Sequence, residues 1–208
     1  MYPKAILFDM DGTLTEERLQ WDDLRADLGV APGEAILEAI HRMTGTQRKR
    51  AEEILHHHER LAAERSTLNP GCRELLTWMD TRGIGRALIT RNTRASVRTV
   101  FDRCGLHFDI AITREDGLFK PDPSPLLLAC EQLGVHPDHA MMVGDWKYDI
   151  MAANAAGIHA VWLSYGRERT FEAVPDRECH DLQQFFDAVR MGLRSSSRTP
   201  GSRSDAAT

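Results

Sequence analysis

The chain lacks any long apolar run and contains few cysteines. No stretch approaches the roughly 18 apolar residues of a membrane-spanning helix, and Ala5–Phe8 is far too short for the apolar core of a signal sequence. The four cysteines, Cys72, Cys104, Cys130 and Cys179, are far apart and form no CxxC or other metal-binding pattern. We therefore expect reduced thiols in a cytoplasmic protein that does not enter a membrane.

The chain also lacks an excess of basic residues. Its formal net charge is -5, with 42% hydrophobic and 27% charged residues, which is ordinary for a globular protein and offers no broad basic surface for nucleic acid. The expected partner is instead a small polar or anionic molecule bound at a local site. A length of 208 residues suits one well-buried domain with a small insert, and the sequence leaves monomer and homodimer both open.

Short β-rich runs alternate with helix-like stretches over most of the chain. Strands are predicted at residues 5–9, 87–90, 108–113, 141–145 and 158–164, and helices at 72–81, 94–104, 125–133 and 148–156. Ser124 is expected to cap the third of these helices, with Pro125 at its first position. This alternation predicts an α/β fold with a Rossmann-like, doubly wound parallel sheet covered by helices on both faces.

Residues 15–69 interrupt the alternation, because they contain no convincing strand and place apolar residues at helical spacing. We interpret them as a small helical cap inserted after the first strand of a core made of residues 1–14 and 70–193. Ligands of open α/β sheets bind beyond the carboxyl ends of the strands, so the insert should lie over the site. Residues 194–208 are rich in Ser, Arg, Gly and Pro and are predicted to be a disordered tail.

Two carboxylates follow the first predicted strand, where residues 8–13 read Phe-Asp-Met-Asp-Gly-Thr. Because side chains alternate along a strand, Asp9 and Asp11 point to the same side if the extended geometry persists, and Gly12 lets the backbone turn sharply. Like charges this close repel each other unless a cation or a proton separates them. The fragment therefore requires a divalent metal ion, a shared proton or both, and a hydrolytic or transfer reaction can use either.

Three further polar groups follow predicted strands. Thr90 and the next two residues precede a helix N-terminus, where backbone N–H groups favour an anion, and Thr90 can donate to it. Lys120 lies in a proline-flanked loop, and its ammonium could neutralise a phosphate or the repelling carboxylates. Asp145 ends a strand, and Asp149 follows one helical turn later, so both can reach the same place.

These motifs, in this order, resemble those of the haloacid dehalogenase-like hydrolase superfamily, in particular its phosphoglycolate phosphatase-like branch, which has a helical cap of the subfamily I (C1) type. The resemblance covers roughly residues 4–165. It implies a phosphatase in which Asp9 attacks phosphorus and forms an aspartyl-phosphate, while Asp11 acts as general acid and base. Thr90 matches the phosphate-binding residue of the second motif, and Lys120 matches the lysine that steadies the nucleophile and the phosphoryl group.

The resemblance also implies a metal ion and a substrate. Asp9, the main-chain carbonyl of Asp11, and Asp145 would hold Mg²⁺, with Asp149 on the metal side of the site. The substrate would be a small phosphorylated metabolite. The candidate substrate-binding residues are Gly12, Thr13, Arg91 and Asn92.

The sequence leaves the leaving group and some alternatives open. Arg18, Arg25 and Arg42 of the insert could meet a substrate carboxylate or a second phosphate, although solvated helix faces are the expected fate of at least two of them. A sugar-phosphate mutase resembling β-phosphoglucomutase would use the same two aspartates, and a 2-haloacid dehalogenase would share the nucleophile but need no metal. A non-catalytic binding protein of the same family is a third alternative.

Overall fold

The computed structural model describes residues 2–192, and the predicted tail at 194–208 lies outside these residues. Six strands form one parallel sheet in the order β3-β2-β1-β4-β5-β6. The strands are β1 (Ala5–Phe8), β2 (Gly85–Ile89), β3 (Ile110–Ile112), β4 (Ala140–Gly144), β5 (His159–Leu163) and β6 (Arg177–Cys179). The predicted α/β fold with a doubly wound parallel sheet is confirmed.

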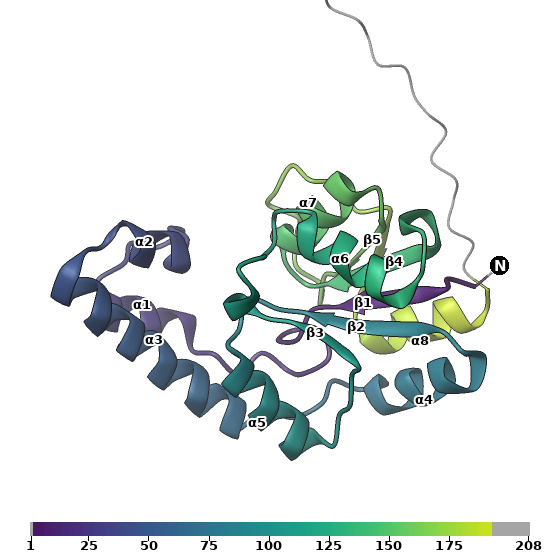
Figure 1. Ribbon diagram of the computed structural model, residues 1–208, viewed down its shortest axis with the longest axis horizontal. Coiled ribbons are helices and arrows are strands. Elements are labelled where there is room, and N and C mark those ends of the chain that lie inside the picture. Colours follow the sequence, from purple (N-terminus) through teal and green to yellow (C-terminus); the bar gives the residue numbers. More distant parts are fainter. Residues whose placement is uncertain (1, 193–208) are drawn as a thin grey trace, which may run out of the picture.

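Helices cover both faces of the sheet (Figure 1). One face carries α4 (Cys72–Arg82), α5 (Arg94–Cys104) and α8 (Leu182–Arg190), and the other carries α6 (Ser124–Leu133) and α7 (Lys147–Ala156). Strand alternation divides the core between them, because Ile6 and Phe8 pack with the first group of helices and Ala5 and Leu7 with the second. All four side chains are fully buried, so β1 lies at the centre of the core. Two short 3-10 helices, η1 (Arg114–Asp116) and η2 (Pro137–His139), complete this part of the chain.

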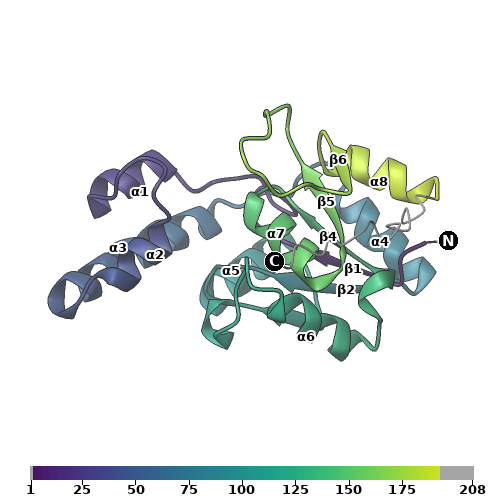
Figure 2. The same cartoon turned by 90° about the horizontal axis from the view of Figure 1, so that it is seen from above.

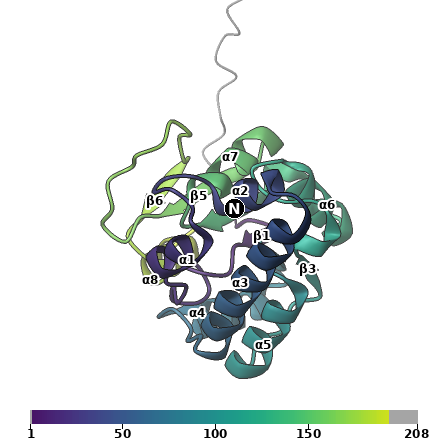
Figure 3. The same cartoon turned by 90° about the vertical axis from the view of Figure 1, so that its left-hand side faces the viewer.

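The remaining helices, α1 (Trp21–Leu28), α2 (Ile36–Arg42) and α3 (Gly45–Glu64), lie to one side of the sheet (Figure 2). They share a separate hydrophobic cluster that includes Leu24, Ile40 and Leu55. The chain enters α1 after leaving β1, and α3 runs beside α5 of the core. Seen from that side, the three helices lie in front of the sheet (Figure 3). We call α1–α3 the cap helices and the rest the core. No helix within residues 2–192 is both long and apolar enough to cross a lipid bilayer.

Three details differ from the sequence-based expectations. The strand β6 and the helix α8 were not predicted, although α8 has an apolar face at helical spacing: Leu182, Phe185, Phe186 and Val189. The predicted capping role of Ser124 is wrong, because this residue is the first of α6 and Pro123 is the cap. The Asp122 carboxylate instead accepts the Ser124 N–H at 2.8 Å, so the acceptor comes from two residues earlier.

Candidate active site

The opening aspartates lie where β1 leaves the centre of the sheet. The Asp9 N–H donates to the carbonyl of Val143 in β4 at 3.0 Å, which keeps Asp9 at the carboxyl edge of the strands. Gly12 has a φ of 72°, and a Cβ on it would lie 2.5 Å from Oδ2 of Asp145. Only glycine therefore allows the turn after Asp11 to pass this close to the acid at the end of β4.

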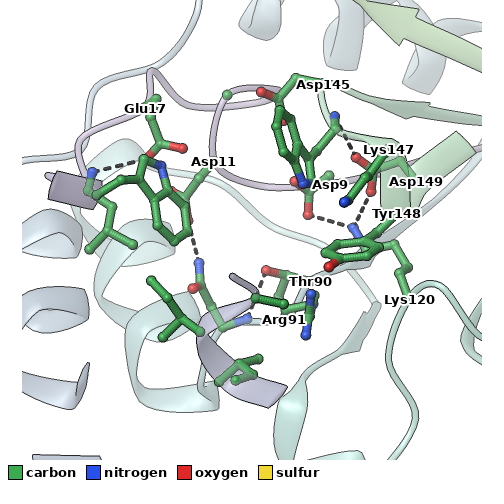
Figure 4. Close-up of a pocket in the computed structure, with 18 of the residues that line it drawn as sticks. Asp9, Asp11, Glu17, Thr90, Arg91, Lys120, Asp145, Lys147, Tyr148 and Asp149 are labelled. Atoms are coloured by element: carbon green, nitrogen blue, oxygen red, sulfur yellow. Dashed lines mark hydrogen bonds and ion pairs between the residues drawn. The ribbon is translucent and has the colours of Figure 1, made fainter. Parts of the chain in front are cut away.

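Lys120 joins two carboxylates that are far apart in sequence. Its Nζ lies 2.7 Å from Oδ1 of Asp9 and 2.6 Å from Oδ1 of Asp149 (Figure 4), and its side chain is only 3% exposed. Burial lowers the pKa of this ammonium, but Asp149 and Asp9 raise it more, so the net shift is upward. Lys120 is therefore a fixed positive charge that holds Asp9 in place.

Asp149 has both carboxylate oxygens engaged by the protein. Lys120 donates to Oδ1, and the backbone N–H of Trp146 donates to Oδ2 at 3.0 Å. Burial raises its pKa to about 6, and the charge of Lys120 opposes that rise. Gly144 is required next to it, because a Cβ at that position would overlap the Asp149 carboxylate. Asp149 is thus positioned to orient Lys120 and the turn before α7.

Asp145 is buried beside Asp9 and Asp149. Burial raises its pKa well above the usual range, and the charges of the two neighbouring aspartates add to the rise. Arg167, which sequence reasoning missed, donates to Oδ2 of Asp145 at 3.1 Å and to its carbonyl at 3.0 Å. The available signal for Arg167 was its place in the loop after the fifth predicted strand, at the same edge of the sheet.

The carboxylates of Asp9, Asp145 and Asp149 suit a hard divalent cation. One ligand oxygen from each lies within 4.8 Å of the others. Within residues 2–192, no donor is found for Oδ2 of Asp9 or for Oδ1 of Asp145. Asp9 and Asp145 therefore each keep one carboxylate oxygen available for a ligand. Mg²⁺ prefers such oxygen ligands, and its charge would relieve the repulsion that raises the pKa of Asp145.

Asp11 has a different environment. The Thr15 hydroxyl donates to its Oδ1 at 3.2 Å, and the side-chain amide of Asn92 donates to its Oδ2. Burial, followed by the charge of Glu17, raises the pKa of Asp11 to about 7. A carboxyl group with this pKa can both donate and accept a proton near neutral pH.

The other residues predicted to contact phosphate are only partly brought together. Thr90 is buried at the end of β2, and its hydroxyl accepts the N–H of Asn92 at 3.1 Å. Arg91 lines the cleft, but its guanidinium pairs with Glu38 of α2 at 2.7 Å. The structure does not bring Thr13 to the cleft wall, because its side chain is fully buried beneath the turn.

A cleft of about 760 Å³ connects these groups to the cap helices. Residues of both the cap helices and the core line this cleft. Several of the lining residues were not predicted as site residues: Glu17, Leu19, Trp21, Trp146, Lys147, Tyr148, Tyr165 and Arg167. Two ion pairs join the cap helices to the core at this place, Arg91–Glu38 at 2.7 Å and the largely buried Arg114–Glu59, also at 2.7 Å.

Comparisons with known proteins agree on one family. The model of the haloacid dehalogenase-like hydrolases matches residues 3–157. A haloacid dehalogenase-like hydrolase domain-containing protein of Arabidopsis thaliana is 33% identical over 166 residues, covering 74% of this chain and 68% of the relative. A phosphoglycolate phosphatase of Pseudomonas putida is 32% identical over 193 residues, covering 79% of this chain and 70% of the relative.

Solved structures share the fold at lower identity. A hydrolase from Pseudomonas syringae superposes with a TM-score of 0.79 at 21% identity, covering 92% of this chain and all of that one. A 2-haloacid dehalogenase from Pseudomonas syringae pv. Tomato superposes with a TM-score of 0.64 at 24% identity, covering 92% and 100%. Because proteins of different named activity share this fold, the choice between them depends on the site residues.

Proposed function

Because this chain belongs to the haloacid dehalogenase-like hydrolases, we propose that it is a Mg²⁺-dependent phosphatase that hydrolyses a small phosphomonoester through an aspartyl-phosphate on Asp9. One observation carries the proposal. Lys120 fixes Asp9 against Asp149, beside Asp145, while Asn92 and Thr15 hold Asp11 in a separate environment.

The two aspartates perform different steps. A carboxylate oxygen of Asp9 attacks phosphorus, the bond from phosphorus to the ester oxygen breaks, and the proton on Asp11 passes to the departing alkoxide. Asp11 then accepts a proton from water, which attacks phosphorus, releases inorganic phosphate and regenerates Asp9. The raised pKa of Asp11, about 7, supports this assignment, since the same group must hold and release a proton near neutrality.

Asp9, Asp145 and the main-chain carbonyl of Asp11 would hold Mg²⁺. Bound there, the ion would neutralise charge on the phosphoryl oxygens and on the clustered carboxylates. Asp149 then acts mainly by orienting Lys120, because both of its oxygens already accept hydrogen bonds from the protein.

The phosphoryl group would lie beside Asp9, between Thr90 and Lys120. The N–H groups after Asp9, the hydroxyl of Thr90 and the ammonium of Lys120 are the donors available to its oxygens. Lys147, at the start of α7, adds a second ammonium that lines the same cleft, and the side chain points toward Asp9 (Figure 4). These cations favour binding of the dianionic ester.

The test is release of inorganic phosphate from a panel of phosphorylated acids, sugars and nucleotides, measured with Mg²⁺ and again after chelation. We expect hydrolysis that needs the metal and disappears in the Asp9→Asn variant. Full-rate hydrolysis by that variant, or in chelator, would contradict the mechanism. A requirement for a bisphosphate with little net phosphate release would indicate a mutase, and halide release that persists in chelator would indicate a dehalogenase.

A further inference from the structure

The two ends of the cleft differ in charge. At the core end, Lys120 and Lys147 point toward Asp9, and Lys120 also pairs with Asp149 of α7 (Figure 4). At the opposite end, Glu17 lies beside Asp11, the proposed acid that protonates the leaving alcohol. Since the ester oxygen must reach Asp11, the substituents of the alcohol extend toward Glu17.

The cations that line the cap end are already engaged by the protein. Arg25 donates to the carbonyls of Ala31 at 2.9 Å and Glu34 at 2.7 Å, and Arg91 pairs with Glu38. Arg18 and Arg42, which do not line the cleft, pair with Glu16 and Glu34. Among the described lining residues, no cation without a protein partner remains at this end to receive a carboxylate or a second phosphate of the substrate.

Glu17 is the opposite case: it is an exposed carboxylate that forms no ion pair among residues 2–192, and Arg167, whose positive charge acts on it, is itself paired with Asp145. It accepts the N–H of Leu19 at 3.0 Å and a hydrogen bond from the side chain of Trp21, both from uncharged donors. A carboxylate in this setting repels another anion and accepts a hydrogen bond from a hydroxyl or ammonium group.

Two large aromatic side chains face the same space. Trp21 of α1 and Trp146, just before α7, are each 46% exposed, and both line the cleft. Leu19, Ile36 and Leu37 extend the apolar wall from the cap side. Half-exposed indole rings in a cleft are well suited to cover the apolar part of a ligand.

We propose that the substrate is a phosphomonoester whose alcohol carries no negative charge, with a hydroxyl or ammonium group that binds Glu17 and an apolar part that packs on Trp21. The proposal rests on the phosphatase activity proposed above and specifies its substrate class. It places phosphoglycolate among the poor substrates, because the glycolate carboxylate would face Glu17 with no free cation beside it.

Three esters with the same two-carbon chain test the charge preference: 2-hydroxyethyl phosphate, phosphoethanolamine and phosphoglycolate. For the wild-type protein with Mg²⁺, we expect kcat/KM for the first two to exceed that for phosphoglycolate by about tenfold or more. In Glu17→Gln the disadvantage of phosphoglycolate relative to 2-hydroxyethyl phosphate should shrink by at least about fivefold. Glu16→Gln is the matched control, because Arg18 already neutralises Glu16 at 2.6 Å, and it should leave the ratio unchanged.

The apolar wall is tested with benzyl and ethyl phosphate, whose leaving groups are both primary alcohols but differ in apolar surface. Trp21→Ala should raise KM for benzyl phosphate by about tenfold and change KM for ethyl phosphate little. An equal change for both esters would overturn the packing role of Trp21.

Different results would refute the phosphatase activity and the proposed substrate class. If the wild-type protein releases phosphate from none of these esters nor from p-nitrophenyl phosphate, the phosphatase activity itself is refuted. If it releases phosphate and prefers phosphoglycolate, or if Glu17→Gln and Glu16→Gln change the ratio equally, the phosphatase stands and the proposed substrate class is overturned.

Discussion

Replacing Lys120 by methionine tests the ion-pair network at the centre of the site. The substitution keeps an unbranched side chain but removes the charge that lies 2.7 Å from Asp9 and 2.6 Å from Asp149. Removing one partner of a buried ion pair typically costs about 3–5 kcal/mol, because the other charges stay buried without compensation. Lys120 is 3% exposed and Asp149 2%, so we expect a loss of this size in the free energy of unfolding at about pH 8.

The cost should depend on pH. In the wild-type protein, burial already raises the pKa of Asp149 to about 6 while Lys120 lowers it, so the variant should have a still higher value. A carboxyl group with a higher pKa in the folded than in the unfolded state binds more protons when folded, and the folded state gains stability as the pH falls through that pKa. The difference between wild type and variant should therefore be largest near about pH 8 and smaller near about pH 5.

The assay is urea denaturation of both proteins at the two pH values, in chelator, followed by circular dichroism and tryptophan fluorescence. Lys147→Met is the matched control, since Lys147 lines the same cleft without a carboxylate partner among the described residues, and we expect a change within about 0.5 kcal/mol. A loss below about 1 kcal/mol for Lys120→Met, as for an exposed pair, would refute the reasoning, and so would an equal loss at both pH values.

Three other predictions concern catalysis. Asp9→Asn should abolish turnover, and Asp11→Asn should lower it by about 10²- to 10⁴-fold, as measured by steady-state phosphate release; wild-type rates in either variant would remove the assigned roles. The rate of single-turnover release of the alcohol should fall as the pH rises through about 7, because Asp11 must be protonated to act as the acid. A rate that does not change between about pH 6 and 8 would contradict this role. Gly12→Ala should lose activity through the overlap of its Cβ with Asp145, whereas Gly29→Ala, at a similar φ of 66° but with open space, should retain it; equal activities would show that the close approach is unimportant.

Much of the core and of the candidate site could be predicted from the sequence. The alternation of apolar runs with helical stretches gave the parallel sheet and five of its strands, because these patterns depend on local periodicity alone. The polar residues at the strand ends, such as Asp9, Lys120 and Asp145, could be predicted to meet because all parallel strands end at the same edge. The helix α8 carries the same kind of periodic signal in its apolar face, whereas β6 is only three residues long and has no alternating apolar pattern.

The partners of each charged group could not be read from the sequence, because they depend on how the cap helices meet the core. Arg91 was a candidate for substrate binding, yet it pairs with Glu38, 53 residues away. Asp11 and Asp9 are identical side chains two residues apart, and only the tertiary structure surrounds one with Asn92, Thr15 and Glu17 and the other with Lys120. The sequence by itself determined five of the six strands and the candidate site residues at their ends, since short-range periodicity and strand-end position decide both. The tertiary structure decided which charges are neutralised and which face the cleft, because electrostatic environment depends on distances that sequence separation does not set.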